Sequence, residues 1–115
     1  MPAERARKLC AAFPHVTEQV QWGNDLVFKI GGKMFAVIPL DPAPKVLAFK
    51  CTPELFAELI ERPGVSPAAY LARAQWVSLD SEDAIAWAEL KDLLRQAYDV
   101  VLGKLPKKQR AALVG

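Results

Sequence analysis

Three lysines and two tryptophans are the residues of this sequence best suited to binding chemistry. They flank a glycine pair or lie near the ends of predicted strands: Lys29, Lys33, Lys50, Trp22 and Trp76. Ammonium groups hold phosphate, and indole rings stack on a nucleic-acid base or another flat ligand. The alternative is a structural role, because lysines commonly line an exposed antiparallel face and protect it from edge pairing.

Signals for catalysis are weak by comparison. The single histidine, His15, follows a proline on a loop, where a surface residue is more common than a general base. Ser66 and Ser81 fit helix caps, and neither lies in a G-x-S-x-G nucleophile motif. The acidic residues within 80–83 lie at an expected helix N-terminus, where carboxylates offset the helix dipole. We therefore expect a non-enzymatic protein with no catalytic residues and no cofactor.

The two cysteines, Cys10 and Cys51, are far apart in the sequence. Neither has a second cysteine or a histidine at the short spacing that a zinc site requires. Both fit small buried hydrophobic residues in a reducing compartment, so we expect neither a metal site nor a disulfide.

Length and composition predict one soluble domain. The chain has 115 residues, of which 52% are hydrophobic and 24% charged, which suits one domain and is too apolar for a disordered chain. Its apolar runs are too short for a transmembrane helix, and its first residues lead into charge rather than an apolar signal segment. We expect a single domain over residues 1–115, with a core of about 5–103 and a basic tail over 104–115, in the cytoplasm.

Positive charge is concentrated at the two ends of the chain. Arg5, Arg7 and Lys8 outnumber Glu4 near the N-terminus, and residues 104–115 hold cations without any acid. Basic ends on an acidic body could steer a polyanion. The alternative is that cations are simply common on solvated tails and at helix C-termini.

Hydrophobic spacing predicts a helix, an antiparallel meander, further helices, a strand and a last helix. Helices are expected over 2–13, from Thr52, over one or two turns from Ser66 to Leu71, from Ser81 to Gly103, and for one more turn in the tail. Strands are expected over 17–22 as an edge, and over 26–30, 33–38, 45–51 and 75–79. This order predicts an α+β two-layer sandwich, with an antiparallel sheet and helices packed on one face.

A hairpin at Gly31-Gly32 is the clearest local signal, because glycines supply the positive φ angles of a two-residue turn. The resulting register opposes Phe28 to Phe35 and Leu26 to Val37. One face would then hold Leu26, Phe28, Ile30, Phe35 and Val37 beneath the helices. The other would hold Val27, Lys29, Met34, Ala36 and Ile38, with Lys50 on the same side.

The sequence resembles the MmcQ/YjbR family of small bacterial proteins over about residues 5–108. The resemblance rests on an ordered series of short motifs: Trp22-Gly23, Phe28-Lys29, Gly32-Lys33, Phe35-Ala36, Lys50, Pro53-Glu54, Pro63-Gly64-Val65, Tyr70, Trp76, Leu90, Leu94, Tyr98 and Leu105-Pro106-Lys107. It implies a compact sandwich of the frataxin-like (CyaY-like) shape, also called a double-wing fold, and DNA binding, which has been proposed for the family from its fold. Members of the family often have histidine where this chain has Asn24 and Gln75, whose amides keep the ability to hydrogen-bond.

Our leading hypothesis from the sequence is a DNA-binding protein. Lys29, Lys33 and Lys50 would contact phosphate, Trp22 or Trp76 would offer a stacking surface, and Asn24 and Gln75 complete the candidate set. The alternative is a module that binds a small molecule or a protein partner through the same half-apolar face, with Val27, Met34, Ala36 and Ile38 as its floor. In either case we expect a monomer or weak homodimer that uses neither a membrane nor a metal.

Overall fold

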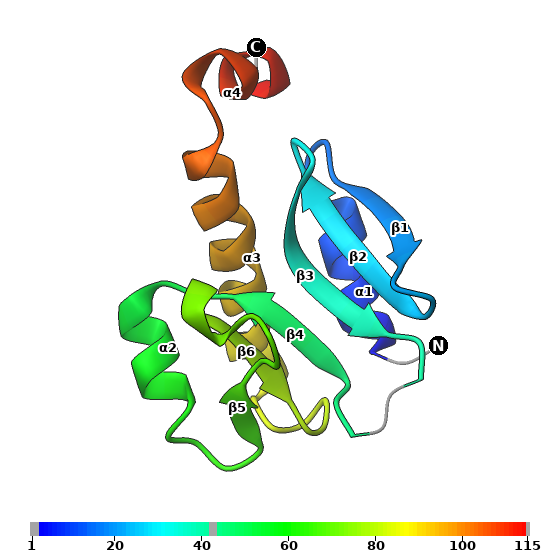
Figure 1. Ribbon diagram of the computed structural model, residues 1–115, viewed down its shortest axis with the longest axis vertical. Coiled ribbons are helices and arrows are strands. Elements are labelled where there is room, and N and C mark those ends of the chain that lie inside the picture. The colour runs from blue at the N-terminus through cyan, green and yellow to red at the C-terminus, as the bar shows by residue number, and fades with distance from the viewer. Residues whose placement is uncertain (1–2, 42–43, 115) are drawn as a thin grey trace.

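The computed structural model describes residues 3–41 and 44–114, which form one six-stranded sheet with helices around it (Figure 1). The first half contains α1 (Glu4–Ala12), β1 (Thr17–Gln21), β2 (Asp25–Ile30), β3 (Lys33–Pro39) and β4 (Leu47–Lys50). The second contains α2 (Pro53–Leu59), β5 (Val65–Pro67), the 3-10 turn η1 (Ala72–Ala74), β6 (Trp76–Leu79), α3 (Trp87–Lys104) and α4 (Lys107–Val114). The strand order is β1-β2-β3-β4-β6-β5, and every neighbouring pair is antiparallel. The α+β fold predicted from the sequence is confirmed.

The main core lies between the sheet and the helices α1 and α3, which pack on one face (Figure 1). Phe13, Phe35 and Tyr98 meet there with ring centroids 5.1 to 6.1 Å apart. The Tyr98 hydroxyl donates a hydrogen bond of 2.8 Å to the Pro14 carbonyl, which fixes α3 against the end of α1. The polar tip of the tyrosine is thereby satisfied while its ring contributes to the core.

The β2–β3 hairpin turns at Gly31-Gly32 as predicted, but a β-bulge changes its register. Lys29 pairs with Met34, and the next pair along the ladder joins Phe28 to Ala36, so Phe35 is the extra residue. The predicted pairing of Phe28 with Phe35 is therefore wrong, and so is every pair beyond it.

The bulge also changes which side chains of β3 face the helices. Phe35 and Ala36 both lie in the main core, followed by Ile38, whereas Val37 faces the opposite side of the sheet. The predicted placement of Ala36, Ile38 and Val37 is wrong for this reason. The bulge turns two consecutive side chains to the same side of the sheet, where the Phe35 ring packs on Tyr98 and the small Ala36 is also fully buried.

Two expected helix starts have other structures. Ser66-Pro67 belongs to the edge strand β5, which pairs with β6, and proline is tolerated there because an edge position needs no ladder donor. Ser81 caps a turn, in which its Oγ accepts the Asp83 amide hydrogen, and α3 begins only at Trp87. Thr52, in contrast, caps α2 as predicted, because its hydroxyl accepts from the Leu55 amide.

The basic tail forms α4, a helix of eight residues that returns to the hairpin turn. The Gln109 side-chain amide donates a hydrogen bond of 2.9 Å to the Gly31 carbonyl, and the preceding Leu105 is buried. The tail is thus attached to the domain.

Candidate ligand-binding face

A second apolar cluster lies on the sheet face that points away from α1 and α3, which we call the open face. Its buried members are Val27, Val37, Ala68 and Trp76, and Met34, Ala48 and Leu71 pack against them. The segment 68–71 crosses this face and is held by backbone hydrogen bonds from Ala68 to Trp76 (3.0 Å) and from Trp76 to Leu71 (3.2 Å). The chain therefore covers one part of the open face itself and leaves another part accessible.

A pocket of about 630 Å³ lies on the open face beside this segment. Its lining is mainly apolar: Trp22, Asp25, Met34, Val37, Pro39, Lys45, Ala48, Ala68, Ala69, Tyr70, Leu71 and Ser78. This volume is within the range of about 300–1,000 Å³ that small-molecule sites occupy. Strands β2, β3, β4 and β6 supply its floor, and the 68–71 segment supplies one wall.

Two exposed aromatic side chains stand at the pocket. Trp22 is 65% exposed and Tyr70 is 104% exposed, and both have a backbone in the left-handed region, with φ of 52° and 66°. Bulky residues rarely adopt this conformation, which costs about 1–3 kcal/mol and persists only where the surroundings impose it. Exposed rings held on strained backbone next to a pocket are typical of a binding site.

The polar groups of the pocket are few. Lys45 donates hydrogen bonds to the Ser66 hydroxyl and to the Asp80 carboxylate. Asp25 takes part in none of the ion pairs among residues 3–41 and 44–114. The pocket therefore offers a largely apolar surface, and Asp25 is the one acidic residue in its described lining.

The lysines and tryptophans predicted to bind are not equally accessible. Lys33 is exposed and Lys29 half-buried, but Lys50 is only 7% exposed and Trp76 only 3%. The ammonium group of Lys50 donates to the Ala74 carbonyl. The segment that precedes β6 folds back beside these two side chains, so the expectation that both lie on an exposed face is wrong.

Asn24 and Gln75 serve in turns. The side-chain amide of Asn24 donates to the Asp41 carboxylate. The backbone carbonyl of Asn24 accepts from the Leu40 amide at 2.9 Å, which closes the loop after Trp22. Gln75 has a φ of 59° and donates from its side chain to the Arg73 carbonyl at 2.9 Å. Whether either amide also contacts a ligand stays a prediction.

Tyr70 and Asp25 were not among the site residues expected from the sequence. The sequence pattern instead places Tyr70 within the short helix expected from Ser66 to Leu71. The sequence signal that favours a pocket wall is Pro67, since a proline on an edge strand ends the pairing and lets the chain turn across the sheet.

Both cysteines are free and buried, as the sequence predicted. Burial raises the pKa of each thiol to about 12, so both are protonated at neutral pH. Within residues 3–41 and 44–114, no three side chains of the types His, Cys, Asp and Glu gather where they could share a metal ion. The helices of the same part of the chain include none with the length and hydropathy to span a membrane.

The fold and its open face define a small α+β domain with a ligand-sized pocket. A family model described as YjbR matches residues 11–100, and the chain belongs to this family. It is similar to the uncharacterized protein YbdF of Escherichia coli O157:H7, with 27% identity over 110 residues, which cover 93% of this chain and 89% of that protein.

Two solved structures share the fold. Protein DR2400 of Deinococcus radiodurans, with a DUF419 domain, superimposes with a TM-score of 0.87 at 28% identity over 97% of this chain and 87% of its own. A protein from Pseudomonas syringae gives a TM-score of 0.68 at 18% identity over 88% of this chain and 99% of its own, which supports the fold alone.

Proposed function

We propose that this chain is a non-enzymatic binding protein whose open face takes a small, flat, mostly apolar ligand. The observation that carries the proposal is the pocket of about 630 Å³ with Trp22 and Tyr70 held at its edge on left-handed backbone. An aromatic ligand would lie on Met34, Val37 and Ala48 and stack against an edge ring.

Asp25 should make the pocket prefer a ligand with a positive charge. Asp25 lines the pocket and forms no ion pair among the described residues, while Lys45 is already paired with Asp80. A ligand with an aromatic ring and a positively charged amine would therefore be favoured over one with a carboxylate.

DNA binding receives less support than it did from the sequence. Two of its proposed contacts, Lys50 and Trp76, are buried, and the open face is lined mainly by apolar side chains. Lys29 and Lys33 remain as candidates on the hairpin.

A titration with three related probes tests the proposal: tryptamine, indole and indole-3-acetate. Followed by amide and indole NMR signals, tryptamine should bind most tightly and indole-3-acetate most weakly, with shifts at Trp22, Met34, Ala48 and Leu71. Tyr70→Ala should weaken tryptamine binding by about fivefold to tenfold, as expected for one lost stacking contact. Val20→Ala is the matched control, because Val20 is also an exposed hydrophobic residue (54%) but does not line the pocket.

Equal effects of the two variants, or no saturable shifts at the pocket, would overturn the proposal. A salt titration with duplex DNA tests the alternative hypothesis, which is that the chain binds DNA. If about three phosphates are neutralised, the log–log salt slope should be about −2.7, and the affected signals should be those of Lys29 and Lys33.

A further inference from the structure

The strand β1 forms one edge of the sheet, and β5 forms the other. Within residues 3–41 and 44–114, β1 pairs with β2 alone, in an unbroken register from Thr17 to Gln21. Figure 1 shows this strand at the rim of the molecule, with the β2–β3 hairpin on its inner side. Four of its five residues are exposed. An edge strand of this kind presents backbone donors and acceptors with which a further strand can pair.

The two edge strands differ in their protection against such pairing. β5 has three residues and ends in Pro67, and both a short strand and a proline hinder the addition of another strand. β1 has five residues, which is an ordinary strand length, and it includes no proline, lysine or bulge. Its one charged residue, Glu18, forms an ion pair of 3.2 Å with Arg7. The edge at β1 is therefore suited to pairing, whereas the edge at β5 is not.

The sequence of β1 is complementary to a second copy of itself. In an antiparallel pair related by a two-fold axis at Gln19, all five residues find partners, and Thr17 opposes Gln21. Glu18 then opposes Val20 rather than the Glu18 of the second copy, so like charges do not face each other. The two Gln19 amides meet at the axis, and each has both a donor and an acceptor. An axis at Glu18 would bring two carboxylates together, and an axis at Val20 would leave part of the strand unpaired.

We propose that this chain forms a homodimer in which β1 pairs antiparallel with β1 of a second copy, with the two-fold axis at Gln19. The pairing joins two six-stranded sheets into one continuous sheet. The interface is built on one short strand, so we expect a weak dimer with a Kd on the order of 0.1 mM. None of the residues 17–21 lines the pocket of the open face, so the dimer does not depend on the proposed aromatic ligand.

Opposite charges at position 19 test the proposal, because this two-fold axis places residue 19 of one copy beside residue 19 of the other. Gln19→Lys and Gln19→Glu should each weaken self-association by about fivefold or more, since each variant places like charges in direct opposition. An equimolar mixture of the two variants should associate at least as tightly as the wild type, because lysine then faces glutamate. Sedimentation equilibrium from about 20 µM to 1 mM protein measures each variant, the mixture and the wild type.

Gln96→Lys is the matched control, because Gln96 is also an exposed glutamine but lies on α3. This variant should self-associate as the wild type does, and in both proteins the amide NMR signals of residues 17–21 should shift with protein concentration. A wild type that stays monomeric up to about 1 mM, or a mixture of the Gln19 variants that associates no more tightly than either alone, would overturn the proposal. Concentration-dependent shifts confined to the pocket would also overturn it, because they would place the contact between copies on the open face.

Discussion

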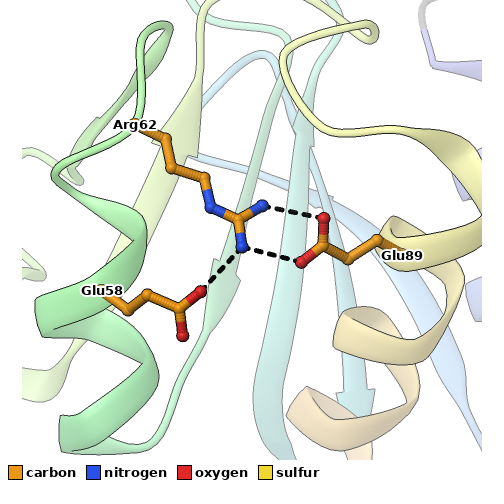
Figure 2. A network of polar contacts seen from close by, with 3 residues as sticks. All are labelled: Glu58, Arg62 and Glu89. Atoms are coloured by element: carbon orange, nitrogen blue, oxygen red, sulfur yellow. Dashed lines mark hydrogen bonds and ion pairs between the residues drawn. The ribbon is translucent and has the colours of Figure 1, made fainter.

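At the scale of single residues, Arg62 joins two helices that are distant in sequence. Its guanidinium binds both carboxylate oxygens of Glu89 at 2.8 Å and one oxygen of Glu58 at 2.7 Å (Figure 2). Glu58 belongs to α2 and Glu89 to the first turn of α3. The bidentate geometry fixes the end of α2 against the start of α3, where no side-chain cap is present.

The Arg62 contacts make stability dependent on pH. Hydrogen bonds from Arg62 lower the pKa of Glu89 below its ordinary value of 4.5. A lowered folded-state pKa gives stability that is fully present above the unfolded pKa and is lost as pH falls through the folded pKa. We expect Glu89→Gln to lower the free energy of unfolding by about 0.5–1 kcal/mol at pH 7, because the pair is partly exposed, and by much less near pH 3. Urea denaturation at the two pH values measures this.

Glu61→Gln is the control for Glu89→Gln. Glu61 is exposed near the end of α2 and belongs to no ion pair within the described residues. A difference between wild type and Glu89→Gln that is equally large at both pH values would contradict the electrostatic explanation.

At the scale of elements, substitutions at the two glycines of the hairpin turn can separate backbone strain from steric overlap with α4 and the residue before it. Both have positive φ, 60° for Gly31 and 82° for Gly32. A Cβ on Gly32 would meet nothing within 4 Å, whereas one on Gly31 would lie 2.6 Å from Leu105 Cδ1 and 2.9 Å from Gln109 Nε2. Gly32→Ala should therefore cost about 1–2 kcal/mol from backbone strain alone.

Gly31→Ala should cost about 1–3 kcal/mol more than Gly32→Ala, because it also displaces the side chains that attach α4. Hydrogen exchange should show faster exchange of the α4 amides in Gly31→Ala but not in Gly32→Ala. Equal losses of stability in the two variants would show that the contacts of Leu105 and Gln109 with Gly31 do not stabilise the turn.

These same elements show what sequence patterns predict well. The sequence predicts the Gly31-Gly32 turn, the Thr52 helix start and the last strand, β6. All three depend on neighbours within a few residues. The bulge at Phe35 was not, because it depends on Phe13 and Tyr98, which are remote in the sequence. Ser66-Pro67 has the composition of a helix start, and only its pairing with β6 makes it a strand.

At the scale of the whole molecule, the candidate site follows from how distant segments meet. Strand alternation predicts a half-apolar second face, but it wrongly assigns Ala36 and Ile38 to that face in place of Val37. The pocket itself depends on the segment 68–71, which crosses the face. Burial of Lys50 likewise depends on a distant segment, because its ammonium donates to the carbonyl of Ala74 in η1. A sequence pattern indicates which residues of a strand share a face. It does not indicate which distant segment of the chain covers that face.

The sheet also consists of two halves that a single helix holds together. Strands β1, β2 and β3 are joined to β4, β6 and β5 through only two register pairs, whereas α3 packs on both β3 and β4. Leu94, which is fully buried, lies on this helix within the main core. The helix, rather than the strand ladder, should therefore make the two halves fold as one unit.

Leu94→Ala tests this cooperativity. The cavity should cost about 2–5 kcal/mol, a large part of the stability of a domain this size. Native-state hydrogen exchange should show the slowest amides of β2 and of β6 losing the same amount of protection, since both report on one global unfolding event. Val20→Ala, at an exposed edge position, should change neither. Loss of protection in β6 with β2 unchanged would show that the halves unfold separately and that the short β3–β4 contact, rather than α3, limits their coupling.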